Sequence, residues 1–189
     1  MQIVLSERAQ VDGRSGEAGA AELRGQIAAL LPDLRAFARF LVRDRVAADD
    51  VVQDSVVRAL SALDQFQDGT NLKAWLFMIL RNQFYEQGRR RKREAAALQA
   101  RPGGEETADP EQLARAEITD LQQLIWRLPP LLREALILVG AQELTHEEAA
   151  AICRVPVGTM KARVSRARSG LLVLMQPATE KEFVEIATP

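Results

Sequence analysis

Apolar residues recur every three or four positions along most of this chain, the spacing that places side chains on one face of an α-helix. Between residues 21 and 44 this pattern predicts one amphipathic helix, or a helix pair broken at Pro32. A second helix is expected over residues 46–63, with Leu60 among its buried positions. A third is expected over residues 71–94, apolar at its start and cationic at its end.

The second half of the chain shows the same periodicity after an interruption. Pro129 and Pro130 suit the first turn of a helix, and Thr145 with Glu148 forms a capping-box pattern. Four helices are therefore expected, near residues 111–127, 129–140, 145–153 and 157–174.

The interruption separates two small helical domains. The segment "LQARPGGEETADP" combines Pro-Gly-Gly with clustered acids and has no apolar period, which is the composition of a flexible linker. The fold class is therefore all-α. The expected parts are a flexible tail at 1–20, a first domain at 21–95, a linker at 96–112, a second domain at 113–175 and a tail at 176–189.

The composition agrees with a helical, charge-segregated protein. Hydrophobic residues make up 47% of the 189 residues and aromatic residues only 5%, which favours helices over strands. The formal net charge is −1, but residues 81–93 and residues 154–168 each carry +5. Residues 94–120 between them carry −5. Two basic segments thus flank an acidic tether, so the near-neutral net charge hides a strong segregation of charge.

Several classes of protein are disfavoured. One Cys and one His are too few for a Cys/His zinc site or an internal disulfide, and Cys153 lies in an apolar helical context as a reduced core thiol. His146 stands alone, and no phosphate-binding loop is present, so no enzyme activity, metal or cofactor is expected. No apolar run resembles a signal peptide or a membrane span, and the expected location is the cytoplasm.

The strongest motif is a helix-turn-helix. The stretch "THEEAAAIC" predicts a first helix, "RVP" a turn, and the following residues a second helix that would enter the DNA major groove. On the second helix Met160, Val164, Ala167 and Leu171 recur at core spacing. Arg154 stands where the turn often has Gly, so a left-handed backbone is expected there, at a cost of about 1 kcal/mol.

The other face of that helix is basic and carries small residues. A basic helix alone is more often a solvated surface, but the turn before it and the lack of acids from 154 to 168 favour DNA binding. The candidate DNA contacts are Thr159, Lys161, Arg163, Ser165, Arg166 and Arg168.

These segments resemble a known family. The stretch "LTHEEAAAICRVPVGTMKARVSRARSGL" is similar to region 4 of the extracytoplasmic-function (ECF) sigma factors of bacterial RNA polymerase. The stretches "ADDVVQDSVVRAL" and "FQDGTNLKAWLFMILRNQFYEQGRRRKRE" look like their region 2. The second of these is particularly similar to the general-stress-response branch, called EcfG-like. The resemblance covers roughly residues 20 to 174.

The resemblance implies three binding surfaces. Region 4 would read the −35 promoter element through the basic helix. The helix with the D-x-V-Q-D signature would dock on the clamp helices of the largest polymerase subunit, through Asp50, Gln53, Asp54 and Arg58. A capture loop formed by Gln67, Asp68, Gly69, Thr70 and Asn71 would hold an unstacked base of the −10 element. The single strand would continue along Lys73, Arg81, Asn82 and Tyr85 to the phosphate contacts Arg89 and Arg90 and the rest of residues 89–93.

The implied partners are core RNA polymerase, promoter DNA and an anti-sigma factor that covers both domains. The alternatives are a sigma-like adaptor that sequesters the anti-sigma factor, and a helix-turn-helix activator. The adaptor is disfavoured because such adaptors carry an additional receiver domain. The activator would leave the Asp50, Gln53, Asp54 signature unexplained. Trp75 could stack on a base, although its spacing favours a place in the core.

Overall fold

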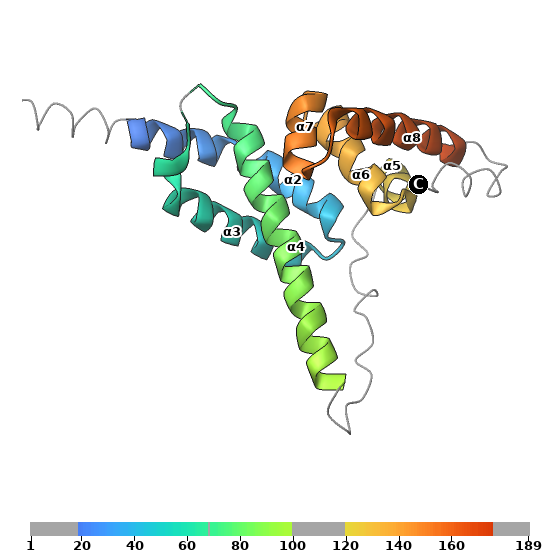
Figure 1. Cartoon of the computed structure of the whole chain (residues 1–189), viewed down its shortest axis with the longest axis horizontal. Coiled ribbons are helices and arrows are strands. Elements are labelled where there is room, and N and C mark those ends of the chain that lie inside the picture. Colours follow the sequence, from blue (N-terminus) through green and yellow to red (C-terminus); the bar gives the residue numbers. More distant parts are fainter. Residues whose placement is uncertain (1–18, 68, 100–119, 176–189) are drawn as a thin grey trace, which may run out of the picture.

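The computed structural model describes residues 19–67, 69–99 and 120–175, in which all the regular structure is helical (Figure 1). Residues 1–18 of the first predicted tail, the second predicted tail, residues 100–112 of the predicted linker, the beginning of the predicted helix at 111–127 and Asp68 lie outside the described residues. Residues 19 and 20, predicted as part of the tail, are helical. The all-α expectation is confirmed. We call residues 19–99 the N-terminal part and residues 120–175 the C-terminal part.

The N-terminal part is a helical bundle. A helix over residues 19–29 ends in a turn at Leu30, and α2 (Leu31–Leu41) begins with Pro32 in its first turn, so the sequence forms the helix pair. The remaining elements are α3 (Arg45–Ser61), a short 3₁₀ turn (Leu63–Gln65) and α4 (Leu72–Gln99).

The N-terminus of α3 lies one residue before the predicted start at residue 46. The helix begins at Arg45, and the Asp44 carboxylate caps it by accepting a hydrogen bond from the Ala47 N–H at 2.7 Å. Asp49 and Asp50 therefore lie beyond the first turn, where the helix dipole gives them little stabilisation. The prediction of Leu60 as buried is wrong: it is 41% exposed, because α3 buries Ala48, Val51, Val52, Ser55 and Ala59.

The C-terminal part contains α5 (Asp120–Arg127), α6 (Pro130–Leu136), α7 (His146–Cys153) and α8 (Val157–Met175). The helix predicted over 129–140 is α-helical only to Leu136 and continues as a π-helical turn, Ile137–Ala141. A π turn contains an extra residue and so shifts the register of the side chains that follow it. Ile137 and Leu138 at its start are both buried.

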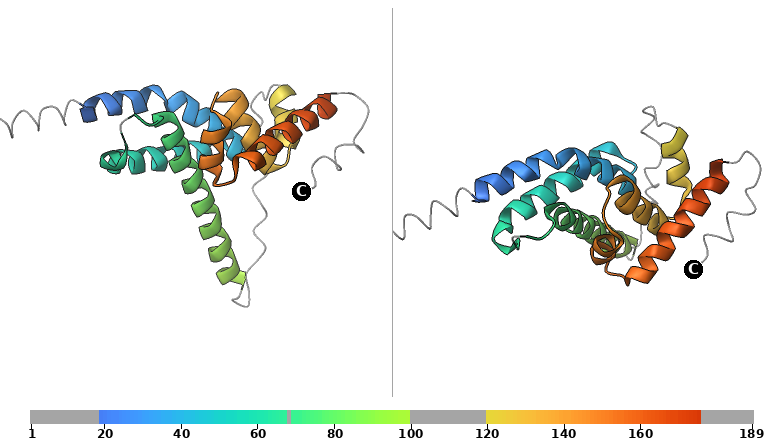
Figure 2. Two further views of the ribbon diagram at one scale, coloured as in Figure 1. Left: turned by 45° about the horizontal axis from the view of Figure 1, so that its top comes forward. Right: turned by 90° about the horizontal axis from the view of Figure 1, so that it is seen from above.

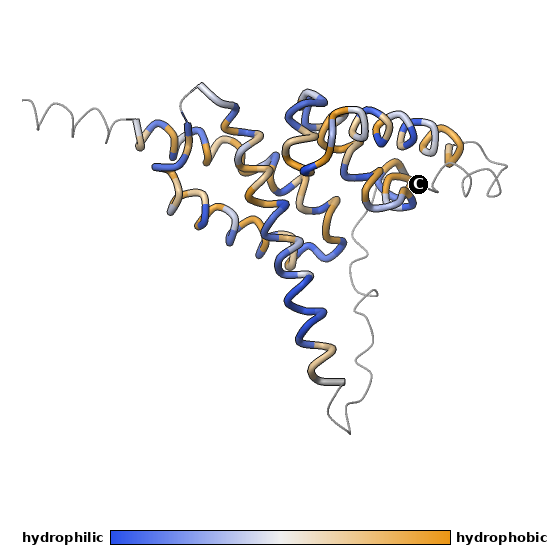
Figure 3. The backbone as a smooth tube through the Cα atoms, viewed as in Figure 1, coloured by the Kyte–Doolittle hydropathy of each residue, from blue (hydrophilic) through white to orange (hydrophobic). Residues whose placement is uncertain are grey.

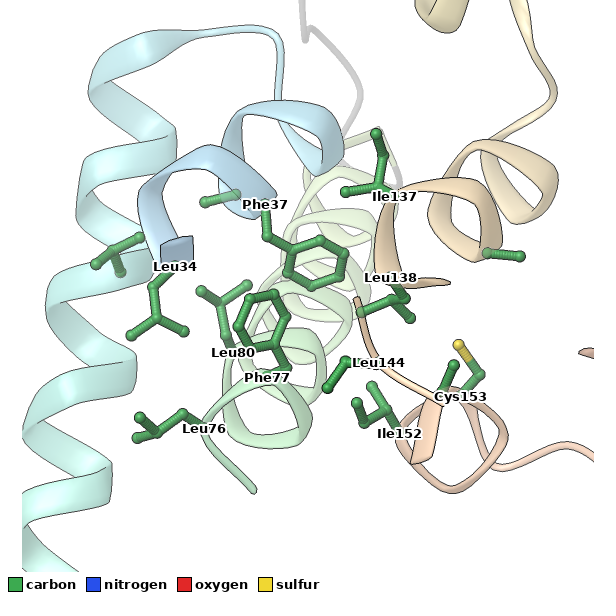
Figure 4. Packing of buried hydrophobic residues seen from close by; sticks show 14 of the residues in the cluster. Leu34, Phe37, Leu76, Phe77, Leu80, Ile137, Leu138, Leu144, Ile152 and Cys153 are labelled. Atoms are coloured by element: carbon green, nitrogen blue, oxygen red, sulfur yellow. The ribbon is translucent and has the colours of Figure 1, made fainter. Parts of the chain in front are cut away.

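One hydrophobic core joins the two parts (Figure 4). Phe37 of α2 and Phe77 of α4 pack with their ring centroids 4.9 Å apart. Ile137 and Leu138 of the π turn and Ile152 of α7 belong to the same cluster of buried residues. α4 and α7 lie side by side, as the views in Figures 1 and 2 agree. The parts predicted as two domains thus share a core.

The C-terminal half of α4 stands apart from this core. It projects beyond the other described helices (Figures 1 and 2), and it is hydrophilic along most of its length, with a less polar tip (Figure 3). Every residue from 88 to 97 is exposed. The transition from core helix to basic rod follows the change in the sequence from apolar to cationic residues.

Candidate DNA- and polymerase-binding surfaces

The helix-turn-helix forms as predicted. Thr145 and Glu148 make a complete capping box at the start of α7. The Thr145 backbone N–H donates to the Glu148 carboxylate at 2.8 Å, and this is the main reason why the pKa of Glu148 is lowered. α7 ends at Cys153, and Arg154 adopts the left-handed conformation with φ 55° and ψ 49°. The turn then places α8 across α7.

Arg154→Gly is expected to stabilise the folded chain by about 1 kcal/mol, because Gly adopts a left-handed backbone without the Cβ clash that Arg154 has. Thermal or urea unfolding measures the change. Arg168→Gly is the matched control, since Arg168 is an exposed arginine within a helix, and there glycine should destabilise. Equal destabilisation by both substitutions would contradict the expectation.

The two faces of α8 divide as the sequence predicts. Met160, Val164 and Ala167 are at most 1% exposed, and Leu171 packs against the core. Lys161, Ser165 and Arg168 are exposed, while Thr159, Arg163 and Arg166 are partly exposed. The six candidate −35 contacts thus lie off the buried face, along one helix that follows a tight turn.

The candidate capture loop is a hydrogen-bonded turn. The Thr70 hydroxyl donates to the Gln67 carbonyl oxygen at 2.7 Å, and Gly69 has φ of 84°, which a residue with Cβ rarely adopts. The Asn71 side-chain oxygen accepts from the Ala74 N–H at 3.2 Å and so caps α4. Trp75 packs against Phe66 with ring centroids 5.4 Å apart, which supports its assignment to the core.

Three candidate −10 residues, two on α4 and one that caps it, contact the C-terminal part. Arg81 forms an ion pair with Glu134 of α6, with Nε and Oε1 2.7 Å apart. The Tyr85 hydroxyl lies 3.5 Å from the other Glu134 oxygen. Asn71 donates to the Glu148 carboxylate at 2.6 Å. Lys73, in contrast, pairs within the N-terminal part with Asp33, and Asn82 is half-buried.

The electrostatics of this contact follow from its burial. The Glu134 side chain is 1% exposed and that of Arg81 is 13% exposed. Burial opposes the charge of Arg81, but the hydrogen bond and charge of Glu134 outweigh it, so the pKa of Arg81 is raised. Burial also raises the pKa of Tyr85. Arg81 is therefore a cation held beside a buried carboxylate.

An exposed stripe runs along α3. Val46, Asp50, Gln53, Val57 and Leu60 follow one another at intervals of four and three residues and are all exposed. Val46 is 69% exposed and Val57 64% exposed, which is high for valine. Exposed apolar residues at this spacing form the kind of surface that packs against another helix. We call these five residues the α3 stripe. The sequence analysis missed its three apolar members, although their spacing is visible in the sequence.

The two other candidate polymerase contacts face α4. Asp54 accepts a hydrogen bond from Gln87 at 2.9 Å, and Arg58 donates to Gln83 at 2.9 Å. Arg58 also forms an exposed ion pair with Glu86 at 3.2 Å. Asp54 and Arg58 thus have a structural role between two helices, and Asp50 and Gln53 remain on the open stripe.

Among the described residues, the basic end of α4 makes local contacts only. Arg90 and Glu94 pair at 2.7 Å, and the hydrogen bond and charge of Glu94 raise the pKa of Arg90. The Arg93 side chain donates to the Arg89 carbonyl oxygen at 3.4 Å. Residues 89–93 present five cations to solvent along one projecting helix.

Two other observations concern what the described residues contain. They hold no group of three or more His, Cys, Asp or Glu side chains that could bind a metal ion. None of their helices has both the length and the apolar content to cross a membrane.

Cys153 is buried, as predicted, and burial raises the pKa of its thiol to about 12.

Comparison with known proteins identifies the family. Residues 27–94 match Sigma-70 region 2, and residues 118–171 match Sigma-70 region 4. The chain is 45% identical over 161 residues to the ECF RNA polymerase sigma factor EcfG of Rhodopseudomonas palustris, covering 85% of this chain and 89% of that protein. The chain belongs to the ECF sigma factors. Its N-terminal part is region 2 and its C-terminal part is region 4, in the order that the sequence motifs predicted.

Solved structures agree with this ECF sigma factor assignment. The sigma factor RpoE in complex with the anti-sigma factor NepR from Bartonella quintana is 40% identical, with a TM-score of 0.69, and the match covers 84% of this chain and 99% of RpoE. CnrH in complex with the cytosolic domain of CnrY is 26% identical, with a TM-score of 0.60, and the match covers 85% of this chain and 96% of CnrH. The expected EcfG-like branch is therefore supported by sequence and by fold.

Proposed function

We propose that this ECF sigma factor holds core polymerase through the α3 stripe, captures the −10 element with region 2, and reads the −35 element with α8. The observation that carries the proposal is that α8 buries Met160, Val164 and Ala167, while Lys161 and Arg168 are exposed and its other two arginines are partly exposed. A helix of this kind, presented by a tight turn, can enter the major groove, where arginine and lysine pair with guanine.

The α3 stripe is the proposed polymerase contact. Its apolar residues lie on both sides of Asp50 and Gln53 along the helix. The stripe therefore offers apolar surface and hydrogen-bonding groups to a partner helix. Asp50 has no N-terminal capping role, because Asp44 performs it. Asp54 and Arg58 contribute mainly by fixing α3 against α4.

The −10 site is proposed at the start of α4. The turn from Gln67 to Asn71 would surround an unstacked base, and Lys73, Arg81, Asn82 and Tyr85 would follow the strand. Stacking on aromatic rings and contacts to cations are the interactions by which proteins bind single strands. Residues 89–93 would hold the backbone farther along.

An anti-sigma factor is the proposed regulator. The related RpoE of Bartonella quintana is bound to NepR, and CnrH is bound to CnrY. By analogy we assign to this chain an inhibitor of the NepR type, a role in a general stress response and a place in the cytoplasm. We propose no catalytic activity. The sigma-like adaptor is disfavoured because the basic face of α8 is intact and outward.

Run-off transcription with core polymerase on a template library randomised at the −35 and −10 elements tests the proposal. Lys161→Ala and Arg163→Ala are expected to relax the preference at individual −35 positions by about 10- to 100-fold, because each loses a contact to a base or a nearby phosphate. Ser169→Ala is the matched control on an exposed position of the same helix. Unchanged −35 preference in both variants would remove α8 from the reading of the promoter.

A further inference from the structure

Two arginines share one tryptophan ring where region 2 meets region 4. The guanidinium carbon of Arg133 of α6 lies 3.9 Å from the centre of the Trp126 ring of α5. The guanidinium carbon of Arg43, in the loop between α2 and α3, lies 5.1 Å from the same ring. Arg133 also donates a hydrogen bond to the Trp126 carbonyl oxygen at 3.1 Å. We call Arg43, Trp126 and Arg133 the Trp126 site; it combines one cation from each region.

The positive charge of Arg133 is poorly compensated. The residue is only 8% exposed, and buried charges in proteins are normally paired with an opposite charge. Among the described residues, however, neither Arg133 nor Arg43 forms an ion pair with a carboxylate. The adjacent Glu134 pairs with Arg81 instead. Burial and, to a smaller extent, the charge of Arg43 lower the pKa of Arg133 to about 10.

An oxyanion held by the two guanidinium groups would compensate both charges. The face of the Trp126 ring attracts cations, but it offers no oxygen to accept a hydrogen bond. A carboxylate offers two oxygens, whose spacing matches the paired N–H groups of a guanidinium, and such charge-assisted hydrogen bonds are among the strongest in proteins. Arg43 is exposed and has no hydrogen-bond partner among the described residues, so it is free to provide these groups.

The composition and position of the site favour a protein as the source of the oxyanion. Tryptophan and arginine are the residues that most often anchor protein–protein interfaces. The site lies on α5, α6 and the loop between α2 and α3, whereas the proposed DNA contacts are on α8 and along α4. A nucleic acid backbone follows an open row of cations such as residues 89–93. Arg133 is recessed by comparison and can receive only a small group.

We propose that the Trp126 site binds the carboxylate of an acidic peptide segment of a partner protein, with Arg43 and Arg133 as its two cations. Because each region provides one arginine, the bound segment contacts both regions at once. The anti-sigma factor proposed above is the partner expected to cover both regions, and the proposal rests on that regulation for the identity of the partner. Binding of the segment stabilises the arrangement in which the two regions share a core.

The test uses the free full-length chain with Trp75→Phe, in which Trp126 is the single tryptophan. The probe is a capped peptide with four glutamates separated by glycines, and the reference peptide has glutamine in place of each glutamate. We expect the Glu peptide to change the fluorescence of Trp126 saturably at about millimolar concentration, as two charge-assisted hydrogen bonds would allow. The Gln peptide should have no effect at the same ionic strength.

Arg43→Gln removes one of the two cations at an exposed position and should weaken binding of the Glu peptide by about tenfold. Arg43→Lys keeps the charge but loses the paired N–H groups, so its affinity should lie between the two. Arg24→Gln is the matched control, because it removes an exposed arginine from the helix over residues 19–29. Equal weakening by Arg43→Gln and Arg24→Gln would mean that the peptide responds only to the net charge of the chain, and would overturn the site.

Arg43→Glu tests the uncompensated charge of Arg133 without any probe. It replaces the cation that repels Arg133 with a carboxylate, and should raise the midpoint of thermal unfolding by about 2 to 4 °C. Since this carboxylate would occupy the site, binding of the Glu peptide should also be lost. Arg24→Glu makes the same change of charge elsewhere and should not raise the midpoint. An unchanged or lower midpoint in Arg43→Glu would contradict the need of Arg133 for an anion.

Inorganic phosphate distinguishes the source of the oxyanion. Tighter binding of phosphate than of the Glu peptide, lost in Arg43→Gln, would overturn the acidic segment as the occupant and assign the site to a small phosphate compound. No saturable change in Trp126 fluorescence with either probe would overturn the site itself. Run-off transcription tests the reading of the promoter by α8 without an inhibitor, so the promoter assignments and the Trp126 site can fail separately.

Discussion

Val57→Glu is expected to weaken the assembly of the sigma factor with core RNA polymerase by about a hundredfold, because it places a charge in the centre of an apolar contact. Val57 is 64% exposed in the free chain and lies between Gln53 and Leu60 on the α3 stripe. The stability of the free chain should change little, since an exposed position tolerates a charged side chain. Binding of labelled core polymerase measures the first effect, and thermal unfolding the second.

Ala28→Glu is the matched control for Val57→Glu. It adds the same charge at an exposed position of the helix over residues 19–29, away from the stripe. Asp54→Ala provides a second comparison: it removes the hydrogen bond with Gln87, so any loss of polymerase binding should come with a loss of stability. Full core binding by Val57→Glu would exclude the α3 stripe as the polymerase contact.

The features that the sequence predicted are local ones. The core positions Met160, Val164 and Ala167 follow from the period of one helix, and the left-handed Arg154 follows from the residues needed in a three-residue turn. The capping box at Thr145 is likewise a pattern within four residues. Each depends on neighbours in the sequence, so the period and the residue types were sufficient.

The features that the sequence did not predict depend on which helices pack together. Arg81 and Glu134 are 53 residues apart, and their charges alone do not select each other among many acids and bases. Leu60 follows the apolar period of α3 but lies at the edge of the buried face. Whether such an edge position is covered depends on how α3 packs against α4. The π turn at Ile137–Ala141, which shifts the register after α6, has no composition signal that distinguishes it from an ordinary helix end.

The shared core adds a constraint on how the sigma factor works. The two regions match separate families, yet Phe37, Phe77, Leu138 and Ile152 bury one another in a single cluster. Separation of the regions would expose these residues to water, so a partner that binds both regions together stabilises the arrangement with the shared core.

Neutralising residues 89–93 to glutamine is expected to make promoter binding by the holoenzyme much less dependent on salt. All five cations lie on the projecting end of α4 (Figure 3), where they can follow a phosphate backbone. If four of them contact phosphates, the slope of log affinity against log salt should become less steep by about 3 to 4, because each contact releases about one condensed counterion. The affinity at low ionic strength should fall by about a thousandfold.

The salt dependence of promoter binding distinguishes phosphate contacts by residues 89–93 from a general effect of the charge of the chain. Arg24→Gln with Arg39→Gln removes exposed cations of the N-terminal helices and should leave the slope nearly unchanged. Arg91→Gln with Arg93→Gln removes the same charge from the basic end of α4 and should reduce the slope by about 2. Promoter preference should stay the same in all variants, because phosphate contacts position the protein without reading the bases. Equal slopes for the two double variants would mean that the basic end of α4 acts only through the net charge of the chain. Residues 89–93 would then make no contacts to phosphates.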